Sequence, residues 1–191
     1  MIDLALKEWS CVCDLLADGR ACLLLRKGGV HEDGGPGRFR LEHDRFAMFP
    51  AWEHENLDWI KPDFRPDRGP ITQEPDAVTF RGWADVAGLW PVPSREAFDE
   101  LDDLHPWLKP QVDMRFAYKP ERPLYALLVR AYRLPEPVVR KNHPSFAGCR
   151  SWVPLEGEGG YRGEIDPVGS TPAIGQAAFD AVRKRVTDTL G

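Results

Sequence analysis

The segment from Leu124 to Leu134 constrains the fold of this chain more than any other. It is apolar at nearly every position, and only Arg130 and Arg133 interrupt it. This pattern is typical of a central strand that is covered on both faces of its sheet. A guanidinium group in such a strand needs a partner, because an isolated buried charge is very unfavourable. The sequence therefore predicts a sheet built around this segment.

Residues 112–119, just before this segment, alternate between apolar and polar side chains. The alternation predicts a strand, because successive side chains of a strand point to opposite faces. Its core face would carry four apolar side chains, those of Val112, Met114, Phe116 and Tyr118. Arg115 and Lys119 would share the other face with Asp113. Two cations on one face could bind an anion.

The first half of the chain shows further strand and helix patterns. Residues 9–16 and 20–27 predict a hairpin around Asp18–Gly19, because this dipeptide accommodates the positive φ angles of a tight turn. The glycine-rich residues 28–37 predict a flexible loop that leads into a strand at 39–43. Residues 52–60 have helical spacing up to Lys61–Pro62, and residues 62–75 predict an irregular connection.

The second half predicts one more strand and two helices. Residues 78–90 have a strand pattern whose phase breaks at Gly82–Trp83, as it does at a bulge. Ser94 can cap a helix whose core face carries Ala97, Phe98, Leu101 and Leu104. The last helix is expected over about residues 172–190, with Thr171 as its cap and Pro172 in its first turn.

These elements together indicate the fold class. Short alternating strands and hairpin patterns dominate, while helices occur singly. We expect an α+β fold with a mostly antiparallel, curved sheet or a partly closed barrel, for which base-binding barrels of the PUA-like kind are the nearest analogy. The 191 residues are expected to form a single domain.

Composition limits the classes of function. The net charge of −5 argues against a protein that coats nucleic acid non-specifically, because that mode needs many cations. Any contact with nucleic acid must be local, and basic residues do exceed acidic ones between Trp107 and His143. The sequence shows neither a membrane-spanning run nor a signal peptide, so we expect a cytoplasmic protein without membrane contact. The four cysteines, Cys11, Cys13, Cys22 and Cys149, are expected to be reduced structural thiols.

Two groups of residues are candidates for chemistry. The first contains aromatic and cationic side chains that could stack a base and hold its phosphate, namely Trp107, Arg115, Lys119, Arg150 and Trp152. The alternative is that these tryptophans belong to the core. The second contains possible metal-site or acid-base residues, namely His43 and His54 with Glu42, Glu53 and Glu55, and a hydrolase would use Glu8, Glu42, Glu53 and His54. Their spacing does not match the His-Glu-x-x-His pattern, and a solvated helix face is the alternative.

Several short segments carry a resemblance to a known family. They are residues 5–9, 23–30, 46–54, 119–125 and 148–152. In this order they resemble the prokaryotic family called domain of unknown function 1802, over about residues 5–153. The resemblance implies an association with restriction-endonuclease-like domains of the Mrr type, and hence with restriction or DNA processing. The chain departs from the family pattern at Glu55, where glutamine is usual.

Our leading hypothesis is a non-catalytic module that binds DNA or RNA. It would hold an exposed or modified base through Trp107 or Trp152, and its phosphate through Arg115, Lys119 and Arg150. A restriction-endonuclease-like protein is a possible partner, and neither a cofactor nor a metal is expected. A metal-dependent nuclease or other phosphoester hydrolase is the enzyme alternative. A small anionic metabolite would use the same cations.

We also expect three cations that lie far apart in the sequence to meet. Arg26 and Lys27 end a predicted strand, and Arg150 begins a short strand after Gly148. If both strands border one cleft, their cations form an anion-binding rim. Like charges repel unless a carboxylate or an anion lies between them, so Glu8 is the expected partner in the empty protein.

Overall fold

A computed structural model describes residues 1–27, 41, 43–148, 151–157 and 161–191. Its strands are β1 (Leu4–Trp9), β2 (Leu23–Arg26), β3 (Arg45–Ala51), β4 (Ala77–Pro91), β5 (Tyr125–Lys141), β6 (Trp152–Pro154), β7 (Glu156–Gly157), β8 (Tyr161–Arg162) and β9 (Thr171–Pro172). Its α-helices are α1 (Ser10–Ala17), α2 (Arg95–Asp99), α3 (Lys109–Ala117) and α4 (Gln176–Leu190). Short 3-10 helices are η1 (Leu57–Trp59), η2 (Pro62–Phe64), η3 (Asp102–Leu104) and η4 (Pro144–Phe146).

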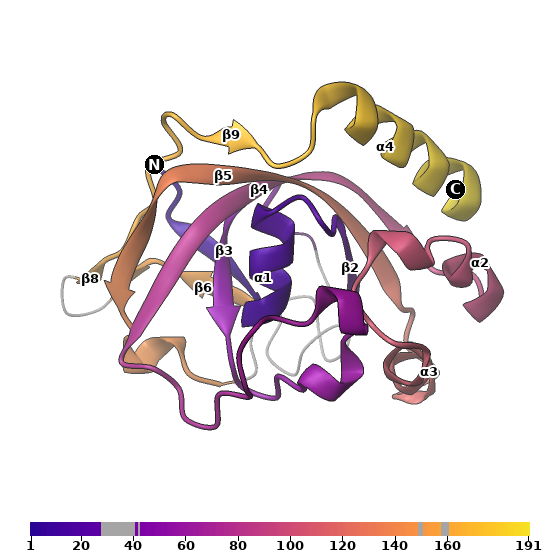
Figure 1. Ribbon diagram of the computed structural model, residues 1–191, viewed down its shortest axis with the longest axis horizontal. Coiled ribbons are helices and arrows are strands. Elements are labelled where there is room, and N and C mark those ends of the chain that lie inside the picture. The colour runs from indigo at the N-terminus through magenta and orange to yellow at the C-terminus, as the bar shows by residue number, and fades with distance from the viewer. Residues whose placement is uncertain (28–40, 42, 149–150, 158–160) are drawn as a thin grey trace.

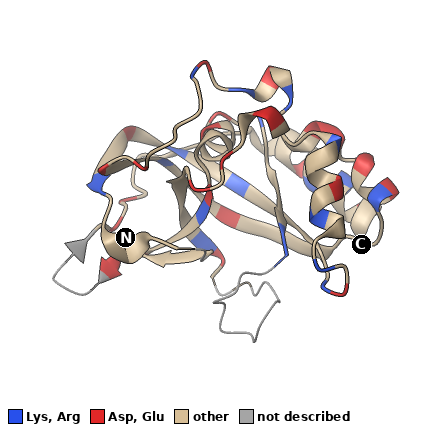
Figure 2. Ribbon diagram, turned by 90° about the horizontal axis from the view of Figure 1, so that it is seen from below, with Lys and Arg blue, Asp and Glu red and all other residues tan. Residues whose placement is uncertain are grey.

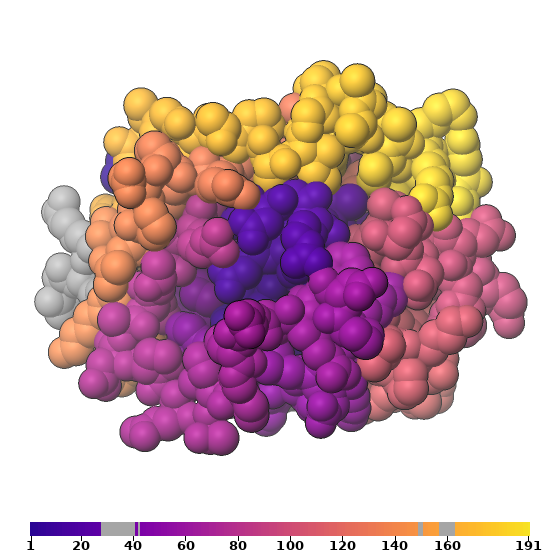
Figure 3. Space-filling view, viewed as in Figure 1, coloured from indigo at the N-terminus to yellow at the C-terminus, as the bar shows by residue number. Residues whose placement is uncertain are grey.

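The main sheet is a curled half-barrel. Its strands follow the order β2-β5-β4-β3-β1-β6, and β9 pairs with β5 outside this path. All pairs are antiparallel except β1 with β3. In Figure 1, β4 and β5 arch over α1, while α4 lies outside the arch. The space-filling view shows the N-terminal residues filling the hollow of the sheet (Figure 3). The expected α+β class with a mostly antiparallel, curved sheet is confirmed.

The apolar segment 124–134 is a central strand, as predicted. It forms the first part of β5, which pairs with β2 on one side and β4 on the other. Arg133 donates to Ala17 O at 3.1 Å and to Asp18 at 2.8 Å. Arg130 lies 5.2 Å from the Phe179 ring, and its buried Nε has no hydrogen-bond partner among the described residues. The burial argument therefore identified the strand, and the expected polar partner is present for Arg133.

The predicted bulge in β4 is also confirmed. The register with β5 shifts between Phe80 and Gly82, and a second shift follows between Val86 and Gly88. A Cβ atom at Gly82 would lie 2.4 Å from Tyr132 O, so this close approach of two strands requires glycine. Bulges increase the local twist of a strand pair. These two shifts therefore help the long β4–β5 pair to curl.

The predicted N-terminal hairpin is wrong. Helix α1 follows β1 without a loop, and every one of its residues except Asp14 is buried. A short run that is apolar on all sides is compatible with a buried helix as well as with a buried strand, so periodicity could not separate them. Gly19, with φ of 70°, ends the helix instead of forming a hairpin turn, and its N–H donates to Leu16 O.

The predicted strand at residues 112–119 is a helix as well. Helix α3 has Pro110 in its first turn, a position at which proline suits a helix. It buries only Gln111 and Val112, while Met114 is 37% exposed and thus does not belong to a core face. The alternation of polarity was therefore accidental, and Arg115 projects from a helix near its C-terminal end.

Two further boundaries differ from the predictions. The expected helix at residues 52–60 is reduced to the single turn η1. The last helix begins at Gln176 after Gly175, because Thr171–Pro172 pair with β5 as the strand β9. The predictions for residues 28–37 lie outside the described residues, as does most of the predicted strand at 39–43.

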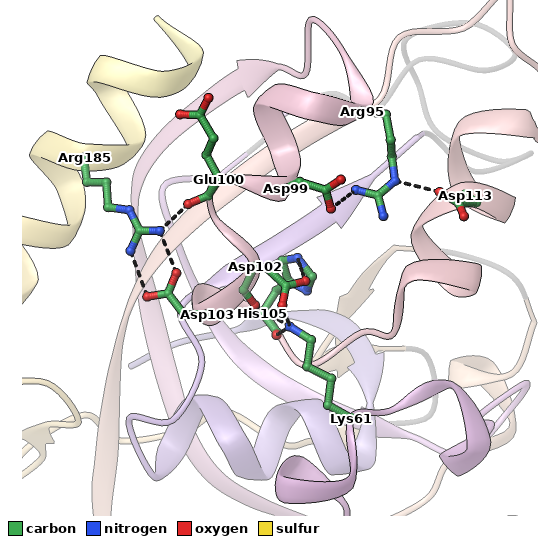
Figure 4. A network of polar contacts seen from close by, with 9 residues as sticks. All are labelled: Lys61, Arg95, Asp99, Glu100, Asp102, Asp103, His105, Asp113 and Arg185. Carbon is green, nitrogen blue, oxygen red and sulfur yellow. Dashed lines mark hydrogen bonds and ion pairs between the residues drawn. The ribbon is translucent and has the colours of Figure 1, made fainter.

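The predicted cap of α2 is confirmed, and a polar network follows it. Ser94 Oγ accepts from the N–H of Ala97, and Phe98 is fully buried. Arg95 bonds Asp99 and Asp113, which ties α2 to α3 (Figure 4). The same network reaches α4, where Arg185 bonds Asp103 and the carbonyl of Glu100, and reaches residue 61, where Lys61 bonds Asp102.

A buried histidine lies inside this network. His105 is 1% exposed, and its ring stacks on Phe98 at 4.7 Å. Burial, reinforced by the nearby charge of Lys61, lowers its pKa from 6.5 to about 3. The folded protein therefore keeps this ring neutral between pH 6.5 and about pH 3, a range in which the same ring in the unfolded chain binds a proton. Since only the unfolded state gains that proton, the stabilising contribution is present above pH 6.5 and is lost as the pH falls.

We predict a measurable effect of His105 on stability between pH 7 and pH 5. At about 1.4 kcal/mol per pKa unit, this side chain alone should lower the free energy of unfolding by roughly 2 kcal/mol over that interval. In the variant His105→Phe, which keeps an aromatic ring against Phe98, the pH dependence should become shallower by that amount. Urea unfolding at both pH values measures it.

The matched control is His54→Asn. The His54 side chain is 76% exposed, and its φ of 64° is one that asparagine tolerates. This variant should keep the pH dependence of the wild type. If the free energy of unfolding of His105→Phe falls between pH 7 and pH 5 as steeply as that of the wild type, the lowered pKa of His105 in the folded protein is contradicted.

Candidate functional site

The expected contact between Glu8 and Arg26 is present. Glu8 lies at the end of β1 and Arg26 at the end of β2, and their side chains form an ion pair at 3.0 Å. The same guanidinium donates to the carbonyl of Lys7 at 2.8 Å. Both side chains are largely buried, with 12% of Arg26 and 9% of Glu8 exposed. A pair that is so well shielded from water is held more firmly than a surface ion pair.

Lys27 follows Arg26 but faces a different element. Its Nζ donates to the carbonyls of Arg115 at 2.8 Å and of Phe116 at 2.9 Å, which are in the last turn of α3. These carbonyls have no partner within the helix, and the negative end of the helix dipole favours a cation there. Burial is the main cause that lowers the pKa of Lys27, and Glu121 opposes it. Lys27 therefore fixes the end of α3 against β2.

Arg115 is placed beside the ion pair by this contact. Its side chain is partly buried, and burial lowers the pKa of its guanidinium. The charge of Glu8 raises this pKa and that of Arg26 lowers it further, so both groups of the ion pair act on Arg115. Within the described ranges, the Arg115 guanidinium makes no hydrogen bond or ion pair. We call Glu8, Arg26, Lys27 and Arg115 the arginine cluster.

The arginine cluster contains more donors than acceptors. Arg26 uses one terminal nitrogen for Glu8 and Lys7, while its buried Nε has no acceptor among the residues described. Glu8 uses its other carboxylate oxygen for the N–H of Trp9 at 2.8 Å. The one carboxylate of the cluster is thus engaged on both oxygens, whereas Arg115 has unused donors. An anion with several oxygens would complete this arrangement.

Arg150 falls outside the described residues. The expected meeting of Arg26, Lys27 and Arg150 therefore stays a prediction. The ion pair between Glu8 and Arg26 is the part of it that the structure bears out.

The two candidate tryptophans lie in the hydrophobic core. Trp107 is 2% exposed and Trp152 is 8% exposed. Trp152 packs edge-to-face on Phe46 at 5.6 Å, and Trp107 lies beside His105. Neither indole presents an open face, so a base could stack on them only after a rearrangement. Lys119, the remaining cation of this group, lies 5.0 Å from the Tyr118 ring.

The possible hydrolase residues lie in two different places. Glu53 and His54 line a pocket of about 550 Å³, whose wall consists of Trp52, Glu53, His54, Glu55, Pro70, Ile71, Thr72, Glu74, Ala147 and Gly148. Glu8 belongs instead to the arginine cluster, and Glu42 is outside the described residues. Among the residues described, no group of three or more His, Cys, Asp or Glu side chains is arranged to hold a metal ion.

Glu55, which the sequence suggested as a possible metal ligand or acid-base residue, has a structural role that the sequence reasoning did not predict. Its side chain is 1% exposed, and its Oε1 accepts from the N–H of Cys11 in the first turn of α1 at 2.8 Å. Arg68 binds both carboxylate oxygens, at 2.8 and 3.0 Å, and also donates to Ser10 Oγ. Glu55 therefore caps α1 from a distant segment. No local capping pattern could reveal this.

The described cysteines fit the expected structural role. Cys11, Cys13 and Cys22 are free and buried. Burial raises the pKa of all three thiols, that of Cys22 to about 12, so none is a thiolate near neutral pH. Cys11 and Cys13 both lie in helix α1.

Comparison with known proteins gives one match. The model of the family described as a domain of unknown function (DUF1802) matches residues 5–183, and the chain belongs to this family. The suspected resemblance is thereby confirmed, and it extends past residue 153 into α4. No curated protein and no solved structure matches. In the part of the chain that is described, no helix is both long and apolar enough to cross a membrane.

We predict that Glu55 contributes strongly to stability. Glu55→Ala would leave the Cys11 N–H of α1 without its acceptor and Arg68 without its carboxylate, so the free energy of unfolding should fall by about 2–4 kcal/mol. Glu55→Gln keeps an oxygen for Cys11 and should lose less. Glu53→Ala, in the same pocket but outside these contacts, should change stability by less than about 0.5 kcal/mol. Equal losses in Glu55→Ala and Glu53→Ala, measured by urea unfolding, would contradict the capping role.

Proposed function

We propose that this chain is a non-catalytic module that binds the phosphate group of a nucleotide unit, free or within a nucleic acid, at the arginine cluster. The observation that carries the proposal is the Arg115 guanidinium, which is partly buried and has no acceptor among the described residues. Arginine keeps its proton in proteins, so this group stays a charged donor that can bind an anion. Such donors are arranged for an anion that arrives from outside.

Phosphate fits the chemistry of these donors. A guanidinium presents planar, parallel N–H groups that match two oxygens of a phosphate. Arg26 is already held by Glu8 and by the carbonyl of Lys7, so it adds fixed positive charge beside Arg115. Lys27 holds the end of the helix that carries Arg115. The cluster is therefore organised before the ligand binds, which reduces the entropy that binding must overcome.

The rest of the described surface favours a local contact. Acidic and basic side chains are interspersed over the ribbon, and no single face is uniformly basic in this view (Figure 2). Many arginines bind carboxylates of the same chain, among them Arg45, Arg81, Arg95 and Arg185. A protein that follows a nucleic-acid backbone over a long distance would need these cations free. The ligand contact is accordingly limited to one or two phosphates.

This proposal retains the DNA- or RNA-associated module expected from the sequence, with changed site residues. Arg26 replaces Lys119 as a residue that contacts the phosphate. The proposal does not require a base to stack on Trp107 or Trp152. A restriction-endonuclease-like partner, implied by the family resemblance, is compatible with a small binding module. The hydrolase alternative receives less support, because no group of three or more His, Cys, Asp or Glu side chains among the described residues is arranged to hold a metal ion.

We predict that binding depends on Arg115. Fluorescence anisotropy with a labelled single-stranded oligonucleotide, its duplex and a mononucleotide as competitor should show binding to at least one of these ligands. Arg115→Ala should weaken it at least tenfold, because a charge-assisted contact to phosphate is lost. The affinity should depend only weakly on salt. A plot of the logarithm of the binding constant against the logarithm of the salt concentration should have a slope near −1 to −2, as expected for contact with one or two phosphates.

The matched control is Lys109→Ala. Lys109 is an exposed cation at the other end of α3, so its removal changes the net charge equally. Binding should remain within about twofold of the wild type. No binding to any of the three ligands, or an equal loss in both variants, would overturn the proposed function.

A further inference from the structure

The geometry points to a terminal phosphomonoester, and not an internal phosphodiester, as the group that the arginine cluster takes. This inference rests on the proposed function, because it assumes that the cluster binds phosphate. It specifies the class of ligand: the phosphorylated end of a nucleic acid or a free nucleotide. Three properties of the cluster carry it, namely its burial, its charge and its unused donors.

The cluster is largely buried. Lys27 is 6% exposed, the side chains of Glu8 and Arg26 are 9% and 12% exposed, and Arg115 is partly exposed. An internal phosphodiester has a chain continuing on both sides, so it can touch a partly buried cation only if the protein surface admits both continuations. A monoester is attached on one side and can approach with its oxygens first. The burial of the cluster therefore favours an end over the middle of a chain.

The charge of the cluster matches a dianion. Arg26, Lys27 and Arg115 carry three positive charges, and Glu8 offsets one of them. A phosphomonoester carries a charge of about −1.5 to −2 at pH 7, whereas a diester carries about −1. In a partly desolvated site, a charge that remains unbalanced is unfavourable, so the dianion is the better complement.

Other charged groups near the cluster do not alter this balance. Glu121 is close enough to raise the pKa of Lys27, but its side chain is 67% exposed and lies 3.6 Å from Arg122. Lys7 directs its Nζ elsewhere, to the carbonyl of Gly148 at 3.2 Å and near the Phe49 ring at 5.7 Å. Among the described residues, the excess positive charge of the cluster therefore remains.

The unused donors match the oxygens of a monoester. The Arg115 guanidinium has five N–H groups, and no described residue accepts from them. A phosphomonoester offers three non-bridging oxygens as strong acceptors, while a phosphodiester offers two. Two of these oxygens can bind Arg115 in parallel, and the third is left for water or a further donor.

The experiment compares oligonucleotides that differ only at their ends. One unlabelled strand is prepared with a 5′-phosphate, with a 3′-phosphate and without a terminal phosphate, and each competes for binding with the wild type, Arg115→Ala and Lys109→Ala. Adenosine monophosphate and inorganic phosphate are the small competitors. A terminal phosphate should increase affinity at least tenfold for the wild type and for Lys109→Ala. In Arg115→Ala this preference should disappear.

The pH dependence gives a second readout. Below about pH 6 the phosphomonoester dianion takes up a proton and becomes a monoanion, so its advantage over the unphosphorylated strand should decline. At each pH, the affinity for the phosphorylated strand is divided by the affinity for the unphosphorylated strand. Changes in the protein that affect both strands equally cancel in this ratio.

Each outcome has a definite meaning. If adenosine monophosphate competes as well as the phosphorylated strand, the inference holds and a free nucleotide is the ligand. If the strands bind equally with and without terminal phosphate, and Arg115→Ala weakens both, the proposed function holds and this inference is overturned. If no phosphate compound binds, both are overturned. Melting curves of Arg115→Ala, and of Arg115→Lys as a charge-keeping variant, confirm that loss of binding is not loss of fold.

Discussion

The bulged pairing of β4 with β5 is the constraint on which the other elements depend. These two strands pair over almost their whole length, and the register shifts near Gly82 and Gly88 help them to curl. The hollow on one side is filled by α1, which accounts for the burial of nearly every residue of that helix. A helix in this position brings the ends of β1 and β2 near each other. Glu8 and Arg26 can therefore meet in a shielded place.

The candidate site forms where the ends of two strands and one helix meet. β1 supplies Glu8, β2 supplies Arg26 and Lys27, and α3 supplies Arg115. The ion pair joins the two strands, and Lys27 joins β2 to the helix. On its other side, α3 is tied to α2 through Arg95 and Asp113, and the network of Figure 4 continues from there to α4. The position of Arg115 is thus determined from both sides of its helix.

Several parts of this arrangement could be predicted from the sequence. The central strand at residues 124–134, the bulge at Gly82 and the Ser94 cap all depend on local patterns, and all three are confirmed. The pairing of Glu8 with Arg26 followed from a charge argument. By contrast, α1 and α3 were mistaken for strands. The first is buried at every residue except Asp14, and the second has an accidental alternation of apolar and polar side chains.

The missed contacts are long-range ones. Lys27 bonds carbonyls that lie 88 and 89 residues further along the chain, and Glu55 bonds the N–H of Cys11, 44 residues before it. Neither leaves a local pattern, because each depends on how distant elements pack. The burial of Trp107 and Trp152 was an open alternative that only the fold could decide. Sequence patterns thus identified the cations of the site but not their arrangement.

The central claim is that Arg115 and Arg26 form an anion site, and arginine side-chain NMR tests it most directly. The Nε–H resonances of both residues, assigned with Arg115→Lys and Arg26→Lys, are followed during titration with a 5′-phosphorylated dinucleotide. We expect saturable shifts of the Arg115 signal, and of Arg26 beside it, with exposed arginines such as Arg183 unchanged. Unchanged Arg115 and Arg26 signals in the presence of bound ligand would contradict this assignment of the site.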